Sequence, residues 1–225
     1  MSINSRLKQA ISSFVGSGIA PGYTSDTRTS KLYERFLFEI VISAARSEGA
    51  LIDYRDALKN RPQSLLFRES PGQIYAVDEP YTHAIVEFPG KPLLEVHVGV
   101  RVRGVSQVAH ECDICVLYQD EADICRLERR EPDCSRVIIA VESKHYESEL
   151  SLNLARSFIG LAAELQVEGD CYFVSNTSSA SVAKLLAMHR LKWEQNVTPG
   201  SRNDINRLRY AFQSNFKDFK AKYGI

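Results

Sequence analysis

The chain has 225 residues, of which 44% are hydrophobic and 25% charged, and its 28 basic and 28 acidic side chains give a formal net charge of zero. This size and composition are typical of a globular protein with one full core. They argue against a membrane-spanning protein, because no apolar run approaches the roughly 20 residues of a span. They also argue against a protein that binds nucleic acid through an overall excess of positive charge.

Residues 1–30 are interpreted as a lead-in segment, because three glycines and a proline between positions 16 and 22 interrupt any regular pattern. The first residues lack the apolar stretch of a signal peptide, so we expect a cytoplasmic protein. Apolar residues then recur at helical spacing, which predicts a well-buried helix over 31–46. Strand candidates follow at 81–88, 93–103, 107–118, 136–144 and 170–175.

The order of the later elements predicts the sheet. The segments 93–103 and 107–118 are separated by Gly104-Val-Ser106, which predicts an antiparallel hairpin. The charged stretch 119–135 is interpreted as a connection. Helical periodicity over 149–166 lies between two strands, which predicts a parallel pair. Two more helices are expected, at 179–190 and 203–222.

These elements predict an α/β fold with three α-β-α layers and a central mixed sheet of four or more strands. We expect the helices 31–46 and 149–166 to lie on opposite faces of that sheet. A single domain is expected over 31–225, with a core at about 31–175 and a C-terminal helical extension at 176–225.

The tripeptide Glu142-Ser143-Lys144 ends one apolar strand, and Asp113 ends an earlier one. Because strand side chains alternate between faces, Glu142 and Lys144 share a face, as do Glu111 and Asp113. Two carboxylates and an ammonium can hold a hard divalent cation and orient a water for attack on a phosphodiester.

This arrangement resembles the PD-(D/E)XK phosphodiesterase superfamily, which has the restriction-endonuclease-like fold. The resemblance covers about 31–175, and the sequence Glu-Ser-Lys-His-Tyr is similar to the Mrr-like and Holliday-junction-resolvase-like branches. Cys112 stands where the family's pattern has proline. The resemblance implies a Mg²⁺-dependent endonuclease, with Mn²⁺ as a substitute metal, that cuts DNA and acts in defence against foreign DNA. RNA is an alternative substrate that the sequence does not separate from DNA.

The resemblance also implies roles for individual residues. Asp113 and Glu142 would bind Mg²⁺ with the main-chain carbonyl of Ser143, while Lys144 would position and polarise the attacking water. Glu34 matches the helix carboxylate that completes such sites, and Glu39 is the next choice. Further supporting residues are Arg156 and His145, as contacts to a phosphate, and Glu111, which is either a second metal ligand or a solvated strand-edge residue.

Other patterns have simpler interpretations. His110 falls on the expected apolar face of its strand, which favours a core histidine. Cys112, Cys115, Cys125 and Cys134 offer a zinc site as an alternative, but buried free thiols are favoured because the first two face opposite ways on a strand. The basic residues of the terminal helix favour a solvated face over a DNA contact.

Two functional hypotheses follow. The first is the nuclease, which as a neutral chain would gain DNA affinity as a homo-oligomer or through a partner subunit. The second is a catalytically idle nuclease-like module that binds nucleic acid or protein within a larger complex. The intact Asp113, Glu142 and Lys144 favour the first hypothesis, and the zero net charge favours the second.

Overall fold

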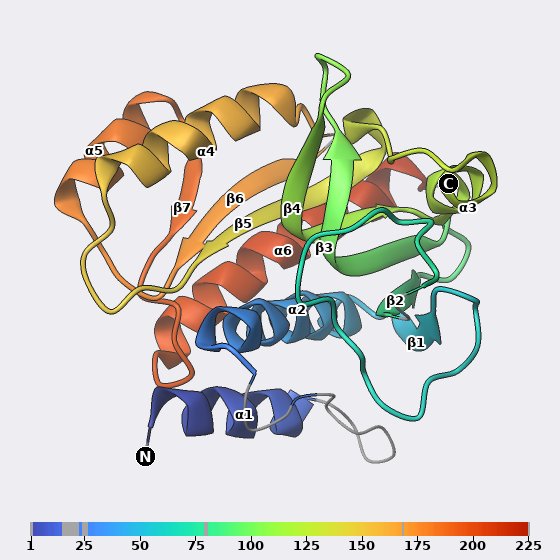
Figure 1. Ribbon diagram of the computed structural model, residues 1–225, viewed down its shortest axis with the longest axis horizontal. Coiled ribbons are helices and arrows are strands. Elements are labelled where there is room, and N and C mark those ends of the chain that lie inside the picture. Colours follow the sequence, from blue (N-terminus) through green and yellow to red (C-terminus); the bar gives the residue numbers. More distant parts are fainter. Residues whose placement is uncertain (1, 15–22, 24–26, 79–80, 168, 225) are drawn as a thin grey trace.

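A seven-stranded mixed sheet forms the middle layer of the computed structural model, which describes residues 2–14, 23, 27–78, 81–167 and 169–224 (Figure 1). The strands lie side by side in their chain order. They are β1 (Leu51–Asp56), β2 (Thr82–Glu87), β3 (Leu94–Arg103), β4 (Ala109–Tyr118), β5 (Val137–Lys144), β6 (Asp170–Ser175) and β7 (Lys192–Glu194). Neighbours from β1 to β5 are antiparallel, whereas β5, β6 and β7 are parallel. The predicted mixed sheet, hairpin and parallel pair are confirmed.

Helices cover both faces of the sheet, as predicted. On one face lie α1 (Ile3–Phe14), α2 (Thr29–Ser47) and α6 (Arg202–Lys222), and on the other lie α4 (Leu152–Glu164) and α5 (Ala180–Met188) (Figure 1). The remaining helix, α3 (Gln119–Glu128), packs beside β3 and β4. The apolar stripe of α6 is buried through Phe212, Phe216 and Phe219, which leaves its basic residues on the outer side. None of the described helices combines the length and the apolarity needed to cross a membrane.

Several elements were not predicted. The lead-in segment contains α1, whose Leu7 and Ile11 are fully buried against the α2 layer, while the glycine-rich stretch 16–22 lies outside the described residues. The interpretation of 119–135 as a connection is wrong, because α3 and a short 3-10 helix, Cys134–Arg136, occupy it. A charged helix of ten residues with few buried side chains has too narrow an apolar stripe for sequence periodicity to detect. Of the two edge strands, β7 has only three residues and β1 carries three charged side chains, so neither shows a clear apolar pattern in the sequence.

Near the middle of the β3–β4 hairpin, the apolar side chains change from one face of the sheet to the other. Val98 and Ile114 pack in the core beneath α2, whereas the next pair, Val100 and Cys112, packs in the core on the opposite face. Between them, Gly99 has a φ of +63°, a left-handed conformation that glycine adopts without steric cost. By the register of the hairpin, Gly99 stands opposite Asp113. Asp113 therefore lies where the chain passes from one face of the sheet to the other.

Pairing between β4 and β5 also ends at this level. The last pair is Ile114 with Val141, whereas β5 runs on beside β6 to Lys144. The two strands therefore separate beyond this pair. The end of β5 faces a gap that no described strand fills on its β4 side.

Candidate active site

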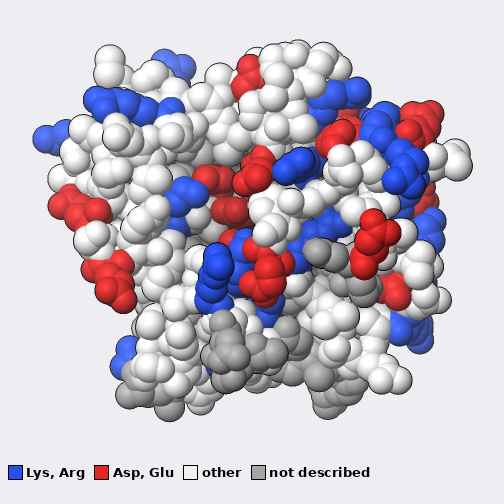
Figure 2. Space-filling view, in the orientation of Figure 1, with Lys and Arg blue, Asp and Glu red and all other residues white. Residues whose placement is uncertain are grey.

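The separation of β4 and β5 opens a cavity of about 350 Å³ beneath α4. Its lining combines acidic, basic and apolar side chains from these three elements. They are His110, Glu111, Asp113, Glu142, Lys144, Ser157, Phe158 and Leu161. Figure 2 shows acidic side chains gathered in a hollow near the middle of this face of the molecule, with basic side chains on either side. The structure thus brings Asp113, Glu142 and Lys144 to one cavity.

Asp113 is held by the strand that carries the other two residues. Its Oδ2 accepts hydrogen bonds from the backbone N–H of Ser143, at 2.7 Å, and from the Ser143 hydroxyl, at 2.9 Å. Because the N–H and C=O of a strand residue point to the same side of the strand, the Ser143 carbonyl also points toward Asp113. A carboxylate and a main-chain carbonyl therefore converge, as a hard cation requires.

Glu142 and Lys144 form an ion pair within β5, with side chains about one-fifth exposed. Burial raises the pKa of Glu142, the charge of Asp113 raises it further, and Lys144 opposes both. Burial lowers the pKa of Lys144, but the charges of Glu142 and Asp113 outweigh burial and raise it overall. Two crowded carboxylates thus share one ammonium, an arrangement that a bound dication would stabilise.

Glu34 adds a third carboxylate from the α2 side. It is 5% exposed, and its two oxygens accept hydrogen bonds from Lys31 at 2.8 and 2.9 Å. Burial raises the pKa of Glu34 to about 7, with the negative charge of Asp113 as the second cause, whereas Lys31 and Lys144 lower it. Glu34 is not among the residues that line the cavity, but it shares the electrostatic field of Asp113 and Lys144.

Three predicted supporting residues do not face the cavity. Glu39 lies five residues beyond Glu34, about 140° around the helix axis, and is buried beside Tyr54 and Arg46 instead. Arg156 is exposed on α4 and donates a hydrogen bond to Asn153. His145 lies just beyond the end of β5, and its ring packs edge-to-face on Tyr33 at 5.3 Å between centroids.

His110 departs from the prediction of a simple alternating strand, whereas Glu111 lies at the cavity with Asp113, as predicted. His110 lines the cavity, and its Nε2 lies 3.3 Å from Oε2 of Glu164 on α4, so the interpretation as a core histidine is wrong. The face reversal at Gly99 and Asp113 explains the error for His110, because the apolar residues on the tip side, Val100 and Cys112, pack in the core opposite to that of Val98 and Ile114. Glu111 is exposed at the cavity, opposite Arg101 of β3.

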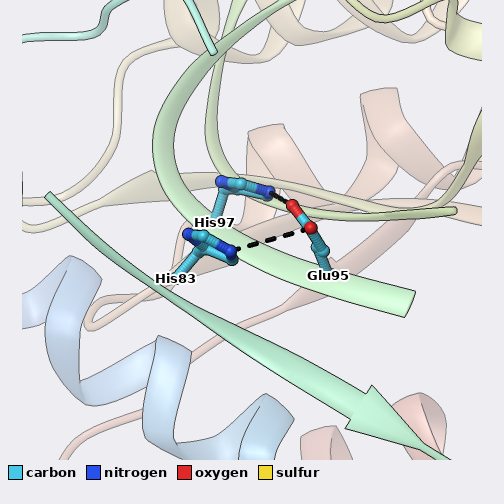
Figure 3. Close-up of side chains that lie close together, drawn as sticks. All are labelled: His83, Glu95 and His97. Carbon is cyan, nitrogen blue, oxygen red and sulfur yellow. Dashed lines mark hydrogen bonds and ion pairs between the residues drawn. The ribbon is translucent and has the colours of Figure 1, made fainter. Parts of the chain in front are cut away.

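A second group of polar residues, which sequence reasoning missed, lies on β2 and β3 (Figure 3). Nε2 of His97 is 2.9 Å from Oε2 of Glu95, and Nε2 of His83 is 3.7 Å from Oε1. All three side chains are at most 1% exposed. Burial lowers the pKa of His83 to about 3, so its ring is neutral. The sequence carried a signal for this group, because Glu95 and His97 are two apart on a predicted strand and must share a face.

Arg126 of α3 completes that group. It donates to both oxygens of Glu95, at 3.1 and 2.5 Å, and lies 3.0 Å from Asp123. Burial raises the pKa of Glu95, but the hydrogen bond from His97 and the neighbouring positive groups outweigh it and lower the pKa overall.

The cysteines behave as buried thiols. All five are free, and Cys112, Cys115, Cys125 and Cys134 pack in one apolar cluster on the α3 side of the sheet. Across the described residues, His83, Glu95 and His97 form the one group of three or more His, Cys, Asp or Glu side chains whose ligand atoms lie close enough together to share a metal ion.

Comparisons with known proteins do not identify a family. A scan against protein-family models found no match, and searches of curated proteins and of solved structures found none either. Any functional assignment therefore depends on the geometry and charge of the sites described above.

Proposed function

We propose that this protein is a metal-dependent nuclease that hydrolyses phosphodiester bonds and that DNA is its substrate. The observation that carries the proposal is the convergence of Asp113, Glu142 and Lys144 on one solvent-accessible cavity at the point where β4 and β5 separate. The resemblance of the same residues to the PD-(D/E)XK pattern supports it independently of the geometry.

The residues of the cavity fit Mg²⁺, with Mn²⁺ as a substitute. Asp113, Glu142 and the carbonyl of Ser143 offer the oxygen ligands that such cations prefer, and the raised pKa of Glu142 reflects the cost of crowding carboxylates without one. A bound Mg²⁺ supplies Lewis acidity toward a phosphate oxygen and a water. The Ser143 amide and hydroxyl orient the Asp113 carboxylate for this purpose.

Lys144 acts on the water and on the developing charge. Its ammonium stays protonated near neutral pH, because the two carboxylates raise its pKa. It therefore donates a hydrogen bond to the attacking oxygen and stabilises negative charge on the phosphate in the transition state. Glu34, held by Lys31, lies within the electrostatic influence of Asp113 and Lys144, and burial raises its pKa to about 7.

The zero net charge gives weight to a second candidate, a nuclease-like module that binds without cutting. Affinity for DNA depends on the number of phosphates neutralised, and a neutral chain neutralises few unless its basic groups are gathered. For the nuclease, we propose that a second copy of the chain or a partner subunit supplies the missing affinity.

A cleavage assay separates the two candidates. Supercoiled plasmid, single-stranded DNA and RNA are incubated with the protein in Mg²⁺, in Mn²⁺ or in EDTA, and products are resolved on gels. We expect cleavage that needs the metal and is lost in Asp113→Asn together with Mg²⁺ binding measured by calorimetry. The control Glu87→Gln removes an exposed carboxylate on β2 and should cut normally. Binding of DNA without cleavage under every condition would instead support the idle module.

A further inference from the structure

The group formed by His83, Glu95 and His97 is placed by the sheet itself. Ile85 pairs with Glu95 and Ala84 with Val96, where the pairing of β2 with β3 ends, and the next residues, His83 and His97, lie against one another. The two imidazole rings stack with centroids 4.9 Å apart and an interplanar angle of 15°. Figure 3 shows that both rings direct one nitrogen toward the same carboxylate, each toward a different oxygen.

The spacing of these atoms matches the needs of a small transition-metal ion. An ion about 2.0–2.1 Å from two ligand atoms at the tetrahedral angle holds those atoms about 3.3 Å apart. The two nitrogen–oxygen distances, 2.9 and 3.7 Å, lie on either side of that value, and the ligand atoms of all three residues lie within 4.8 Å of one another. We propose that His83, Glu95 and His97 bind Zn²⁺, with Glu95 offering both oxygens so that four ligand atoms surround the ion.

The lone pairs that this site needs are available. The Nδ1 atoms of His83 and His97 are buried and have no hydrogen-bond partner among the described atoms. Without an ion, the Glu95 carboxylate, 2.9 Å from Nε2 of His97, favours the proton on that nitrogen, and the unpartnered Nδ1 atoms can take the proton when an ion binds at Nε2. Both rings can then hold the proton on Nδ1 and present Nε2 as a ligand. Two imidazoles and a carboxylate are a donor set that suits zinc and that magnesium, which prefers oxygen ligands, does not favour.

Residues around the group hold the carboxylate in place. Arg126 and the side-chain amide of Gln119 both donate to Glu95, so its orientation is set before any ion arrives. The guanidinium of Arg126 also repels a dication. Asp123, 3.0 Å away, shares that positive charge, and we therefore expect a moderate affinity rather than the very tight binding of a thiolate site.

The site is structural rather than catalytic. Its three side chains are at most 1% exposed, so a substrate has no access to the ion. The ion would join β2 to β3 and, through Arg126, to α3. Because the site is closed in the folded protein, binding is expected to be coupled to folding. The inference is independent of the proposed nuclease activity, since it uses none of the residues of that cavity.

The test measures metal content and thermal stability together. The protein is unfolded in chelator, refolded with or without Zn²⁺, freed of excess metal and analysed for bound zinc. Co²⁺ refolding adds an absorption band that reports nitrogen and oxygen coordination. We expect one zinc per chain and a Tm roughly 5–10 °C higher with Zn²⁺ at about a hundredfold excess over the dissociation constant.

Substituted proteins locate the bound ion. His97→Gln keeps a donor toward Glu95 but removes the imidazole, so it should fold, lose the zinc and lose the Tm increase. His189→Ala removes an exposed histidine and should keep both. The double variant Asp113→Asn, Glu142→Gln should also keep both, which shows that the ion is not in the active-site cavity. Zinc content below about one-tenth per chain in the refolded wild type, or equal zinc content in wild type and His97→Gln, would overturn the proposal.

Discussion

The candidate active-site cavity and the histidine group are built from similar side chains, yet they differ in access to solvent. Glu142 and Lys144 are about one-fifth exposed, whereas Glu95 and His97 are at most 1% exposed. In the cavity, Lys144 faces the carboxylates of Glu142 and Asp113, and in the histidine group Arg126 donates to Glu95 and to Asp123. An accessible group of charged side chains is suited to bind a ligand, and a group closed to solvent is suited to stabilise the fold.

The sheet explains why the two groups differ. The β4 and β5 strands separate beyond Ile114 and Val141, so the side chains at their ends face open space. At the histidine group the pairing of β2 with β3 also ends, at Ala84 and Val96, but Tyr81 packs against both imidazole rings and covers them. Similar charged and polar side chains are therefore open to solvent where β4 and β5 separate, and closed to solvent where neighbouring residues cover the histidine group.

The largest expected effect tests the structural role of the histidine group. Glu95→Ala leaves Arg126 buried without its main partner, and breaking a buried pair in this way costs about 3–5 kcal/mol. Thermal unfolding should show a Tm lower by roughly 6–20 °C. The control Glu87→Ala, an exposed site on the neighbouring strand, should change stability by less than about 0.5 kcal/mol. If Glu95→Ala instead kept its Tm and abolished cleavage, the assignment of this group to the fold would be wrong.

The next effect tests the chemical role of the cavity. Lys144→Ala should reduce cleavage by ~10²–10³, because one preorganised electrostatic donor is lost from the transition state. Mg²⁺ binding measured by calorimetry should survive, since the carboxylates remain. Wild-type cleavage by this variant would reject Glu142-Ser143-Lys144 as the catalytic motif.

A third prediction concerns Glu39, a buried carboxylate that belongs to neither group. Its oxygens have no hydrogen-bond partner among the described atoms, and burial raises its pKa to about 8. Because the folded pKa exceeds the unfolded value, its contribution to stability is full below about pH 4.5 and is lost as pH rises toward 8. Glu39→Gln should reduce this fall in the free energy of unfolding between about pH 4.5 and 8, by at most about 5 kcal/mol. Urea unfolding of the wild type and of Glu39→Gln at about pH 5, 6.5 and 8 measures this change. An identical dependence of stability on pH in the two proteins would contradict the prediction.

The smallest effect concerns the wall of the cavity. Oε2 of Glu164 accepts a hydrogen bond from the backbone N–H of Ser106 and contacts His110, which ties the hairpin tip to the end of α4. Glu164→Ala should speed hydrogen exchange at the Ser106 amide and cost about 0.5–1 kcal/mol of stability, the range of an ordinary hydrogen bond. Cleavage should change by less than about tenfold. A loss as large as that of Lys144→Ala would mean that Glu164 acts in the chemistry.

The alternation of polar and apolar residues and the helical periodicity were sufficient to predict the layers, the hairpin and the parallel pair. They were also sufficient to place Glu142 and Lys144 on one face, because that relation is local to one strand. The role proposed for these residues stays a prediction until cleavage is measured. The same patterns did not predict α3 or the edge strands, because their charged sequences have narrow apolar faces.

The sequence by itself determined the order of the elements and the kinds of side chain available, since both follow from local spacing. Only the tertiary structure decided which of those side chains meet. The face reversal at Gly99 placed His110 at the cavity, and the packing of α2 set Glu34 near Asp113 and Glu39 beside Tyr54. Strand pairing then set His83 against His97 over a distance in sequence that no local pattern spans. These outcomes depend on backbone conformation and on packing between elements distant in the chain, which residue spacing does not encode.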